Sequence, residues 1–217
     1  LYGTRLYIDC SKLEHNIHHL NKIMGNMKII AMVKANAYGH GDITIVKKME
    51  QLGVKYFGVA DFEEGVKLRR QEIHNPIMVM NPGINSIQML IKHKLEPVIY
   101  NNQILIEFIK SINTLSSSFK KKMLPFPVHI KFNTGMNRWG FNSEESSRLI
   151  NSLKDIREIN IKSIYSHLAS TDKKQDNLFT KKQVNELIKI KTKFDNGLKY
   201  KVNLHIYNSF GLRHFLK

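Results

Sequence analysis

A lysine near the start of this chain ends an apolar run. Ile29–Val33 is followed by Lys34, and Tyr38 comes four residues later, directly before a Gly-His-Gly sequence. A lone strand-terminal lysine is most often a solvated residue without chemistry. A primary amine held at the end of a core strand, however, also suits an enzyme that forms a Schiff base, because apolar surroundings favour the nucleophilic amine. Glycines there allow the backbone to approach a ligand closely.

Further polar residues follow three later apolar runs. They are Lys131 and Arg138 after the first run, His167 at the end of the second, and Asn208 with Ser209 after the third. Taken singly, they would be a surface cation, a core histidine or a turn residue. Their joint occurrence at the ends of successive strands makes them candidates for one site.

The elements that must position these residues alternate along the chain. Apolar runs predict strands at Arg5–Asp9, Lys28–Val33, Tyr56–Ala60, Pro76–Met80, Pro97–Tyr100, Val128–Phe132, Lys162–His167 and Leu204–Tyr207. Helical spacing predicts helices at Lys12–Met24, Ile43–Leu52, Phe62–Gln71, Ser86–Lys92, Gln103–Ile112, Ser143–Leu153 and Thr180–Phe194. We expect Ser11 and Asp42 to cap the first two helices, and the lysine-rich segment Ser116–Leu124 to be an exposed loop.

This alternation predicts the α/β class with parallel strands. About seven strand–helix units without an internal break indicate an incomplete TIM-type (β/α)8 barrel whose last unit is absent. A doubly wound open sheet is the alternative, but the glycine fingerprint expected after its first strand is missing. A barrel collects its active-site residues at the carboxyl ends of its strands, which is where the polar candidates stand.

Composition excludes several other classes of protein. The 217 residues include one cysteine, Cys10, so no internal disulfide framework can form and a reducing compartment is expected. No apolar run approaches a membrane span, and the first residues do not read as a secretory leader, so we expect a cytoplasmic protein. No histidine or cysteine spacing indicates a metal site. The net charge of +16 leaves a basic nucleic-acid-binding module open, although the lysines are spread along the chain without a recognition motif.

Residues 31–41 read Ala-Met-Val-Lys-Ala-Asn-Ala-Tyr-Gly-His-Gly and resemble the pyridoxal-phosphate attachment signature of alanine racemases. The resemblance covers essentially the whole chain. It continues from Thr4-Arg5 through the Asn-Thr-Gly-Met-Asn-Arg-Trp-Gly-Phe stretch and Ser166-His167-Leu168-Ala169 to Asn208-Ser209. It implies a fold-type III pyridoxal-phosphate barrel that racemises L- and D-alanine for cell-wall precursors in a homodimer.

The resemblance also implies roles for single residues. Lys34 would form the internal aldimine with pyridoxal 5'-phosphate and act as one of two catalytic bases. Tyr38, Asn208 and Ser209 would bind the cofactor phosphate, and His167 would lie against the pyridine ring. Arg138 would approach both the cofactor and the substrate carboxylate, and Lys131, carbamylated in many members of the family, would support that arginine.

The resemblance further implies an organisation into two parts. Residues 1–10 would be a leading strand that pairs with a C-terminal β-domain, and residues 11–217 would be the pyridoxal-phosphate-binding barrel. The eighth strand and the β-domain, which supplies the second base from a partner subunit, do not occur in this sequence. We therefore expect part of a longer protein that is inactive alone. Val79-Met80-Asn81-Pro82 and Leu95-Glu96-Pro97 resemble the branch of the family in which the racemase is fused behind a wall-precursor ligase, which would explain a start without Met.

Three positions depart from the family pattern, namely Asn133, Trp139 and Tyr207. Asn133 stands where an aspartate is common, and the other two are larger than usual. Other enzymes on this barrel stay open as alternatives: a broad-specificity amino-acid racemase, a pyridoxal-phosphate homeostasis protein or a basic-amino-acid decarboxylase. Both alanine and serine stay open as the preferred substrate of the racemase.

Overall fold

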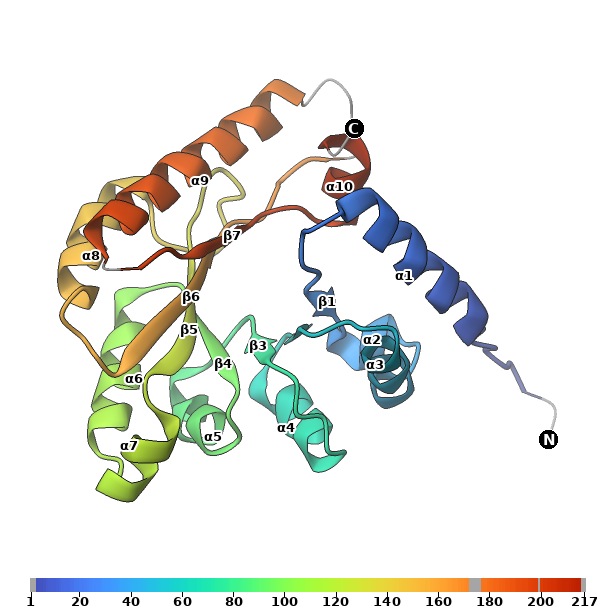
Figure 1. Cartoon of the computed structure of the whole chain (residues 1–217), viewed down its shortest axis with the longest axis horizontal. Helices are drawn as coiled ribbons and strands as arrows, with labels where there is room; N and C mark the ends of the chain where they lie inside the picture. Colours follow the sequence, from blue (N-terminus) through green and yellow to red (C-terminus); the bar gives the residue numbers. More distant parts are fainter. Residues whose placement is uncertain (1–2, 172–176, 199, 216–217) are drawn as a thin grey trace. The chain divides into compact units, whose positions relative to one another are not determined.

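The computed structural model of the chain describes residues 3–171, 177–198 and 200–215. The chain forms two compact units, Leu1–Met80 and Asn81–Lys217, and each is described by itself. Figure 1 labels their helices and strands. The boundary falls within the segment 11–217 that was predicted as one barrel domain, and that domain assignment stays a prediction.

The first unit alternates helices with three short parallel strands. Its elements are α1 (Cys10–Met24), β1 (Ala31–Met32), α2 (Lys34–Tyr38), α3 (Asp42–Gln51), β2 (Phe57–Val59), α4 (Phe62–Arg70) and β3 (Ile77–Val79). β1 pairs with β2 and β2 pairs with β3, both in parallel. Each strand is shorter than predicted, because only the central residues of each apolar run are in the hydrogen-bonded ladder.

The start of the chain differs from the prediction. Residues 3–9 form neither helix nor strand, so the strand expected at Arg5–Asp9 is wrong in this structure; an extended segment needs a neighbouring strand, and none of the described strands pairs with it. Helix α1 begins at Cys10, and Asp9 caps it by accepting a hydrogen bond of 2.8 Å from the backbone amide of Ser11. The expected cap, Ser11, lies inside the helix.

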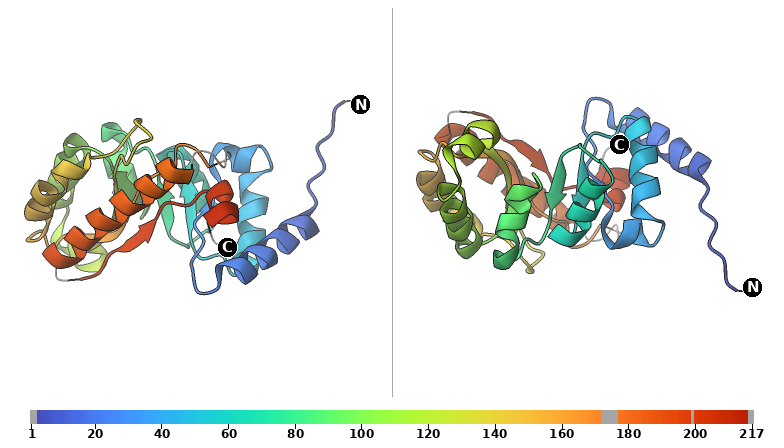
Figure 2. Two further views of the ribbon diagram at one scale, coloured as in Figure 1. Left: turned by 90° about the horizontal axis from the view of Figure 1, so that it is seen from above. Right: turned by 90° about the horizontal axis from the view of Figure 1, so that it is seen from below.

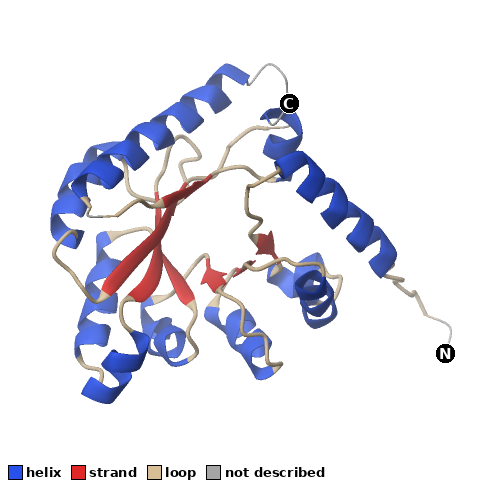
Figure 3. Ribbon diagram, viewed as in Figure 1, coloured by secondary structure: helices blue, strands red, loops and turns tan. Residues whose placement is uncertain are grey.

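The second unit continues the alternation with four parallel strands. Its strands are β4 (Glu96–Ile99), β5 (Phe126–Lys131), β6 (Ile159–Tyr165) and β7 (Asn203–His205), paired in chain order. Its helices are η1 (Ile84–Ser86), α5 (Ile87–Lys92), α6 (Asn102–Asn113), α7 (Ser117–Met123), η2 (Ser143–Glu145), α8 (Ser146–Leu153), α9 (Asn177–Gly197) and α10 (Ser209–Phe215). The red strands in Figure 3 lie side by side within this unit, and Figures 1 and 2 show α8 and α9 along one side of them.

The two faces of this sheet differ in polarity. Val128, Ile130 and Phe132 belong to the hydrophobic core that also contains side chains of α6, α8 and α9. Successive residues of a strand point to opposite faces, so His129 and Lys131 lie on the face away from these helices. Both are nevertheless buried, at 1% and 6% exposure. One face of the sheet therefore packs against the helices, and the opposite face carries buried polar side chains.

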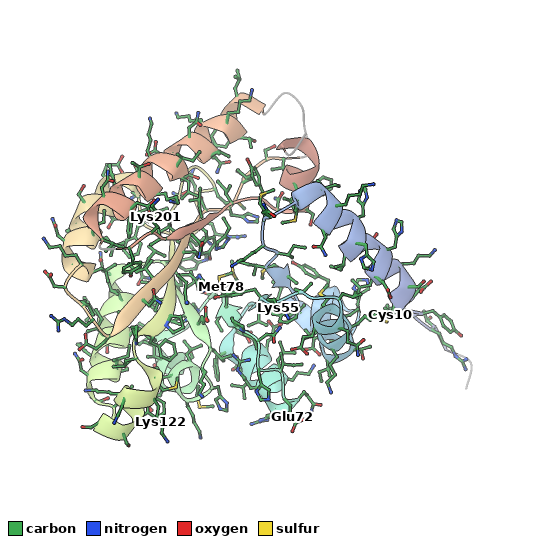
Figure 4. All side chains as sticks on the ribbon, viewed as in Figure 1. Cys10, Lys55, Glu72, Met78, Lys122 and Lys201 are labelled. Carbon is green, nitrogen blue, oxygen red and sulfur yellow. The ribbon has the colours of Figure 1, made fainter. Side chains whose placement is uncertain are left out.

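Two helices of the second unit were not predicted. Ser117–Met123, expected as part of a loop, is the helix α7, which Ser116 caps through Phe119 N at 3.3 Å. Its Phe119 and Met123, four residues apart, pack on the core. Its lysines stay outside, as Figure 4 shows for Lys122 at the edge of the unit. The run of lysines made the short amphipathic pattern of Phe119 and Met123 difficult to recognise in the sequence.

The second unpredicted helix is α10, which begins at Ser209.

The predicted cap of α3 in the first unit is also wrong. Asp42, expected as the cap, is instead the first residue of α3, with Gly41 at the cap position. No helix among the described residues has the length and apolar character needed to cross a bilayer.

Candidate functional site

Lys34 lies two residues after the end of β1 in the first unit and begins α2. The preceding residue, Val33, donates a backbone hydrogen bond of 2.8 Å to Gly58 O on β2, which ties the base of the lysine to the sheet. The Lys34 side chain is half-buried, and its Nζ lies 5.9 Å from the ring centroid of Tyr38. The Tyr38 side chain is 59% exposed. The structure therefore brings these two predicted residues together and leaves the phenol accessible to a ligand.

The backbone between them has an unusual conformation. Ala35, Asn36, Ala37 and Tyr38 have φ angles of 51°, 55°, 52° and 56°, which places four non-glycine residues in the left-handed helical region. Each costs roughly 1–2 kcal/mol relative to the right-handed form. Strain of this kind persists only where surrounding contacts impose it, and it concentrates at functional sites.

Glu64 on α4 supplies the main contact that imposes this turn. Its Oε1 accepts a hydrogen bond of 2.5 Å from Ala35 N, and its Oε2 accepts one of 2.7 Å from Ala60 N. The Asn36 side chain adds a second brace by accepting from Asp42 N at 3.1 Å. The sequence analysis did not identify Glu64, because its role depends on a contact 29 residues away along the chain.

An ion pair lies behind the turn. Lys67 Nζ donates to both carboxylate oxygens of Asp42, at 2.8 and 2.9 Å. Asp42 is only 4% exposed, and it also accepts from Ile43 N at 2.8 Å. A buried carboxylate requires such partners. The pair thereby anchors the start of α3, and with it the glycine-rich segment before it, to α4.

The second unit carries the remaining predicted residues. Lys131 ends β5, and its Nζ lies 5.8 Å from the ring centroid of Tyr165 on β6. Burial raises the pKa of the Tyr165 phenol, and the nearby Arg138 guanidinium opposes that shift. Lys131, Tyr165 and Arg138 therefore lie in one electrostatic neighbourhood. Tyr165 was not predicted, because an aromatic residue in a buried strand looks like ordinary core.

The loop that carries Arg138 is built around Asn133. Its Oδ1 accepts hydrogen bonds from Gly135 N at 3.1 Å and Asn137 N at 2.9 Å, and its Nδ2 donates to Asn137 Oδ1 at 3.0 Å. Asn133, which we expected to depart from the family pattern, therefore organises this loop. An aspartate could accept the two backbone bonds but could not donate the third.

His167 follows β6 and is half-buried. Gln183 of α9, which is fully buried, donates to His167 O at 3.2 Å and accepts from Ala169 N at 3.0 Å. The preceding Ser166 shares a hydrogen bond of 2.8 Å with Thr134, which belongs to the Asn133 loop. These bonds connect the loops after β5 and β6, so His167 and the Arg138 loop are held by one network.

Asn208 and Ser209 follow β7, as predicted from the sequence. Asn208 Oδ1 accepts from Gly211 N at 2.8 Å and from Thr171 Oγ1 at 3.2 Å, so it closes the first turn of α10. Ser209 is exposed. Lys34 and Tyr38 thus belong to the first unit, whereas Lys131, Arg138, His167, Asn208 and Ser209 belong to the second. Their union in one site stays a prediction.

A buried polar chain in the second unit was also missed. Glu96, His129, Ser163 and His205 connect β4 to β7 by side-chain hydrogen bonds. The sequence signal was present, since polar residues interrupt apolar strands at each position. Within the described part of the chain, no cluster of three or more His, Cys, Asp or Glu side chains is placed to share a metal ion.

Comparison with known proteins identifies a single family. The family model described as alanine racemase, N-terminal domain, matches residues 8–215. Alanine racemase of Fusobacterium nucleatum is 32% identical over 214 residues, covering 98% of this chain and 56% of that protein. Alanine racemase of Clostridium tetani is 35% identical over 205 residues, covering 93% and 51%. The chain spans about half the length of the curated relatives it matches.

Solved structures give the same result for the fold. The alanine racemase of Clostridium difficile 630 matches 95% of this chain and 52% of its own, with a TM-score of 0.85 and 26% identity. A second alanine racemase, from Streptomyces lavendulae, matches the whole chain with a TM-score of 0.87 at 20% identity, which bears on the fold alone. The incomplete TIM-type barrel predicted from the repeats is therefore confirmed.

Proposed function

Because this chain belongs to the alanine racemase family, we propose that it supplies the cofactor-binding half of an enzyme that interconverts L- and D-alanine for cell-wall precursors. The observation that carries the proposal is the half-buried Lys34, which stands at the end of β1 in a strained turn beside the accessible Tyr38. Its amine has the chemistry needed to hold pyridoxal 5'-phosphate, and the contacts of Glu64 and Asn36 brace the turn that carries it.

The donor set fits this cofactor. An aldehyde requires a primary amine, which Lys34 provides. A phosphate requires hydroxyl and amide donors, which Tyr38, Ser209 and Asn208 provide, and both hydroxyl-bearing residues are exposed. His167 offers a flat ring to lie against the pyridine. When bound, the cofactor supplies an electron sink for the negative charge that forms at the α-carbon of the amino acid.

Arg138 binds the substrate carboxylate in this proposal. A guanidinium presents a planar fork of donors that matches both carboxylate oxygens, and the Asn133 loop sets the position of its backbone. Lys131 would act through this arginine. Carbamylation of its buried amine would replace a cation by an anion and give Arg138 a counter-charge within the same neighbourhood.

Racemisation requires a proton donor and acceptor on each face of the α-carbon. Lys34 serves one face, where its amine takes or returns the proton. The opposing base comes, in our proposal, from the C-terminal domain of a partner subunit, so the working enzyme is a homodimer in the cytoplasm and this chain alone is inactive. The leading residues 1–10 would pair with that C-terminal domain.

The test uses the full-length protein that contains this chain. Incubation with pyridoxal 5'-phosphate should produce an absorbance band at the edge of the visible range, and borohydride should fix the label on Lys34, as located by peptide mass mapping. Lys34→Ala should abolish the label, and Lys28→Ala, an exposed lysine before the same strand, should not. L-Alanine should then lose optical activity faster than L-serine or L-lysine. A folded protein labelled elsewhere, or not at all, overturns the proposal.

A further inference from the structure

Four neighbouring strands of the second unit each contribute one polar side chain to a continuous chain of hydrogen bonds. Glu96 Oε2 on β4 lies 3.0 Å from His129 Nε2 on β5, and His129 Nδ1 lies 2.7 Å from Ser163 Oγ on β6. Ser163 Oγ lies 3.1 Å from His205 Nε2 on β7. Glu96, His129 and Ser163 are 7%, 1% and 4% exposed, so water is excluded from the bonds among these three residues.

The serine at the centre makes this chain directional. A hydroxyl carries one proton, so Ser163 can donate to only one of the two histidines and must accept from the other. A neutral imidazole, likewise, has one protonated and one proton-free nitrogen. The donor direction at Ser163 is therefore linked to the position of the ring proton on His205.

The charges on Glu96 and His129 would select the histidine to which Ser163 donates its proton. Glu96 is a buried carboxylate, and a buried charge is tolerated when an opposite charge is hydrogen-bonded to it. A protonated His129 would provide that charge, and it would donate Nε2–H to Glu96 and Nδ1–H to Ser163. Ser163 then donates to His205 Nε2. His205 itself stays neutral, because burial, and then the charge of His129, lower its pKa to about 3.

We propose that the Glu96–His129 ion pair, acting through Ser163, sets the tautomer of His205 so that its ring proton resides on Nδ1. His205 also stacks on Tyr165, with ring centroids 4.5 Å apart and an interplanar angle of 8°. Tyr165 pairs in register with both Lys131 and His205 across the sheet. The four residues are thus positioning residues, of which His205 lies in the same register layer as Lys131, and their bearing on catalysis rests on the proposed function.

Several ionisable groups lie around these four residues. Tyr165 stacks on His205, and Lys131 and Arg138 lie close to Tyr165. The rings of His129 and His205 lie edge to face, with centroids 6.4 Å apart.

Nuclear magnetic resonance of 15N-histidine in the cofactor-free, full-length protein tests this directly. His129→Gln and His205→Gln identify the two signals. In the unmodified protein at pH 7, His205 should carry its proton on Nδ1. Ser163→Ala should return His205 to the Nε2 form that free neutral imidazole favours, whereas Ser163→Thr, which keeps the hydroxyl, should retain the Nδ1 form.

A His205 proton found on Nε2 in the unmodified protein at pH 7 overturns the inference, as does a tautomer that Ser163→Ala leaves unchanged. The measurement on the unmodified protein decides the question even if Ser163→Ala does not fold. The Lys34 labelling experiment reads the proposed function separately. Absence of a Lys34 adduct would contradict the proposed function without altering the tautomer of His205. A His205 proton on Nε2 would contradict the inference about the tautomer without altering the adduct.

Discussion

Glu64 accepts a hydrogen bond of 2.5 Å from the backbone amide of Ala35, the residue directly after Lys34. The other oxygen of this carboxylate accepts from Ala60 at the end of β2. One side chain therefore joins the strained turn that carries the lysine to the neighbouring strand. Because the turn has four left-handed residues, its stability depends on contacts of this kind.

Removal of the Glu64 carboxylate should destabilise the first unit. Glu64→Ala leaves two backbone amides without their partner, and we expect it to lower the free energy of unfolding by about 1–3 kcal/mol. Glu64→Gln retains one acceptor oxygen and should cost less. Urea unfolding measures both variants, with the exposed neighbour Glu63→Ala as the control. Equal effects for the Glu63 and Glu64 variants would contradict the assigned role.

The buried and exposed ion pairs should differ in their contribution to stability. Asp42 is 4% exposed and accepts two bonds from Lys67, so Asp42→Asn should cost about 1–3 kcal/mol. Glu107 pairs with Lys110 on the surface of α6, and Glu107→Gln should cost less than about 0.5 kcal/mol. Thermal unfolding of the two variants compares them. A larger loss for Glu107→Gln would show that burial does not govern these pairs.

Arg138→Lys should impair racemisation although it keeps the positive charge. An ammonium cannot bind both carboxylate oxygens through a planar fork, so we expect kcat/KM for L-alanine to fall about 10–100-fold. Arg148→Lys, at an exposed pair with Glu145, is the matched control and should leave the rate unchanged. Steady-state assays of the full-length enzyme measure both. Unchanged kinetics for Arg138→Lys would exclude the proposed carboxylate contact.

Tyr38→Phe should weaken cofactor binding. The phenol hydroxyl is proposed to donate to the cofactor phosphate, and loss of one bond to a charged group raises Kd about tenfold or more. Fluorescence titration of the apoenzyme with pyridoxal 5'-phosphate measures the change. Tyr7→Phe, at a residue that is 82% exposed, provides the control. Identical affinities for the two variants would place the phosphate elsewhere.

Asp195 should make stability depend on pH in the acid range. Burial raises its pKa, but hydrogen bonds from the Lys191 side chain and from Val202 N, the latter at 3.0 Å, outweigh that effect and hold the pKa below its ordinary value. A lowered folded-state pKa stabilises the protein above the unfolded-state value and loses that effect as pH falls through the folded-state value.

The difference in unfolding free energy between the unmodified protein and Asp195→Asn should therefore be constant from about pH 5 to 7 and shrink below about pH 4. Urea unfolding across this range measures it. Glu144→Gln, an exposed carboxylate beside η2, should show no comparable trend. A difference for Asp195→Asn that persists undiminished at low pH would contradict the assignment.

The sequence predicted the order of elements because apolar periodicity is a local property. The strand expected at Tyr56–Ala60 is β2 at Phe57–Val59, and the helix expected at Phe62–Gln71 is α4 at Phe62–Arg70. Prediction failed where a segment depends on distant partners. Arg5–Asp9 pairs with none of the described strands. Helix α7 is held by the packing of Phe119 and Met123 on the core, but its lysines make the segment look like an exposed loop in the sequence.

The sequence by itself determined the fold class and the family, and it singled out Lys34 as the proposed reactive amine, since these follow from residue types at fixed spacing. Tertiary structure alone decided how the turn after Lys34 is held and how Glu96, His129, Ser163 and His205 come together beside Tyr165. The physical reason is that hydrogen bonds and ring contacts join residues about 30 or more positions apart. Only folding of the strands into register brings such partners within 3 Å of each other.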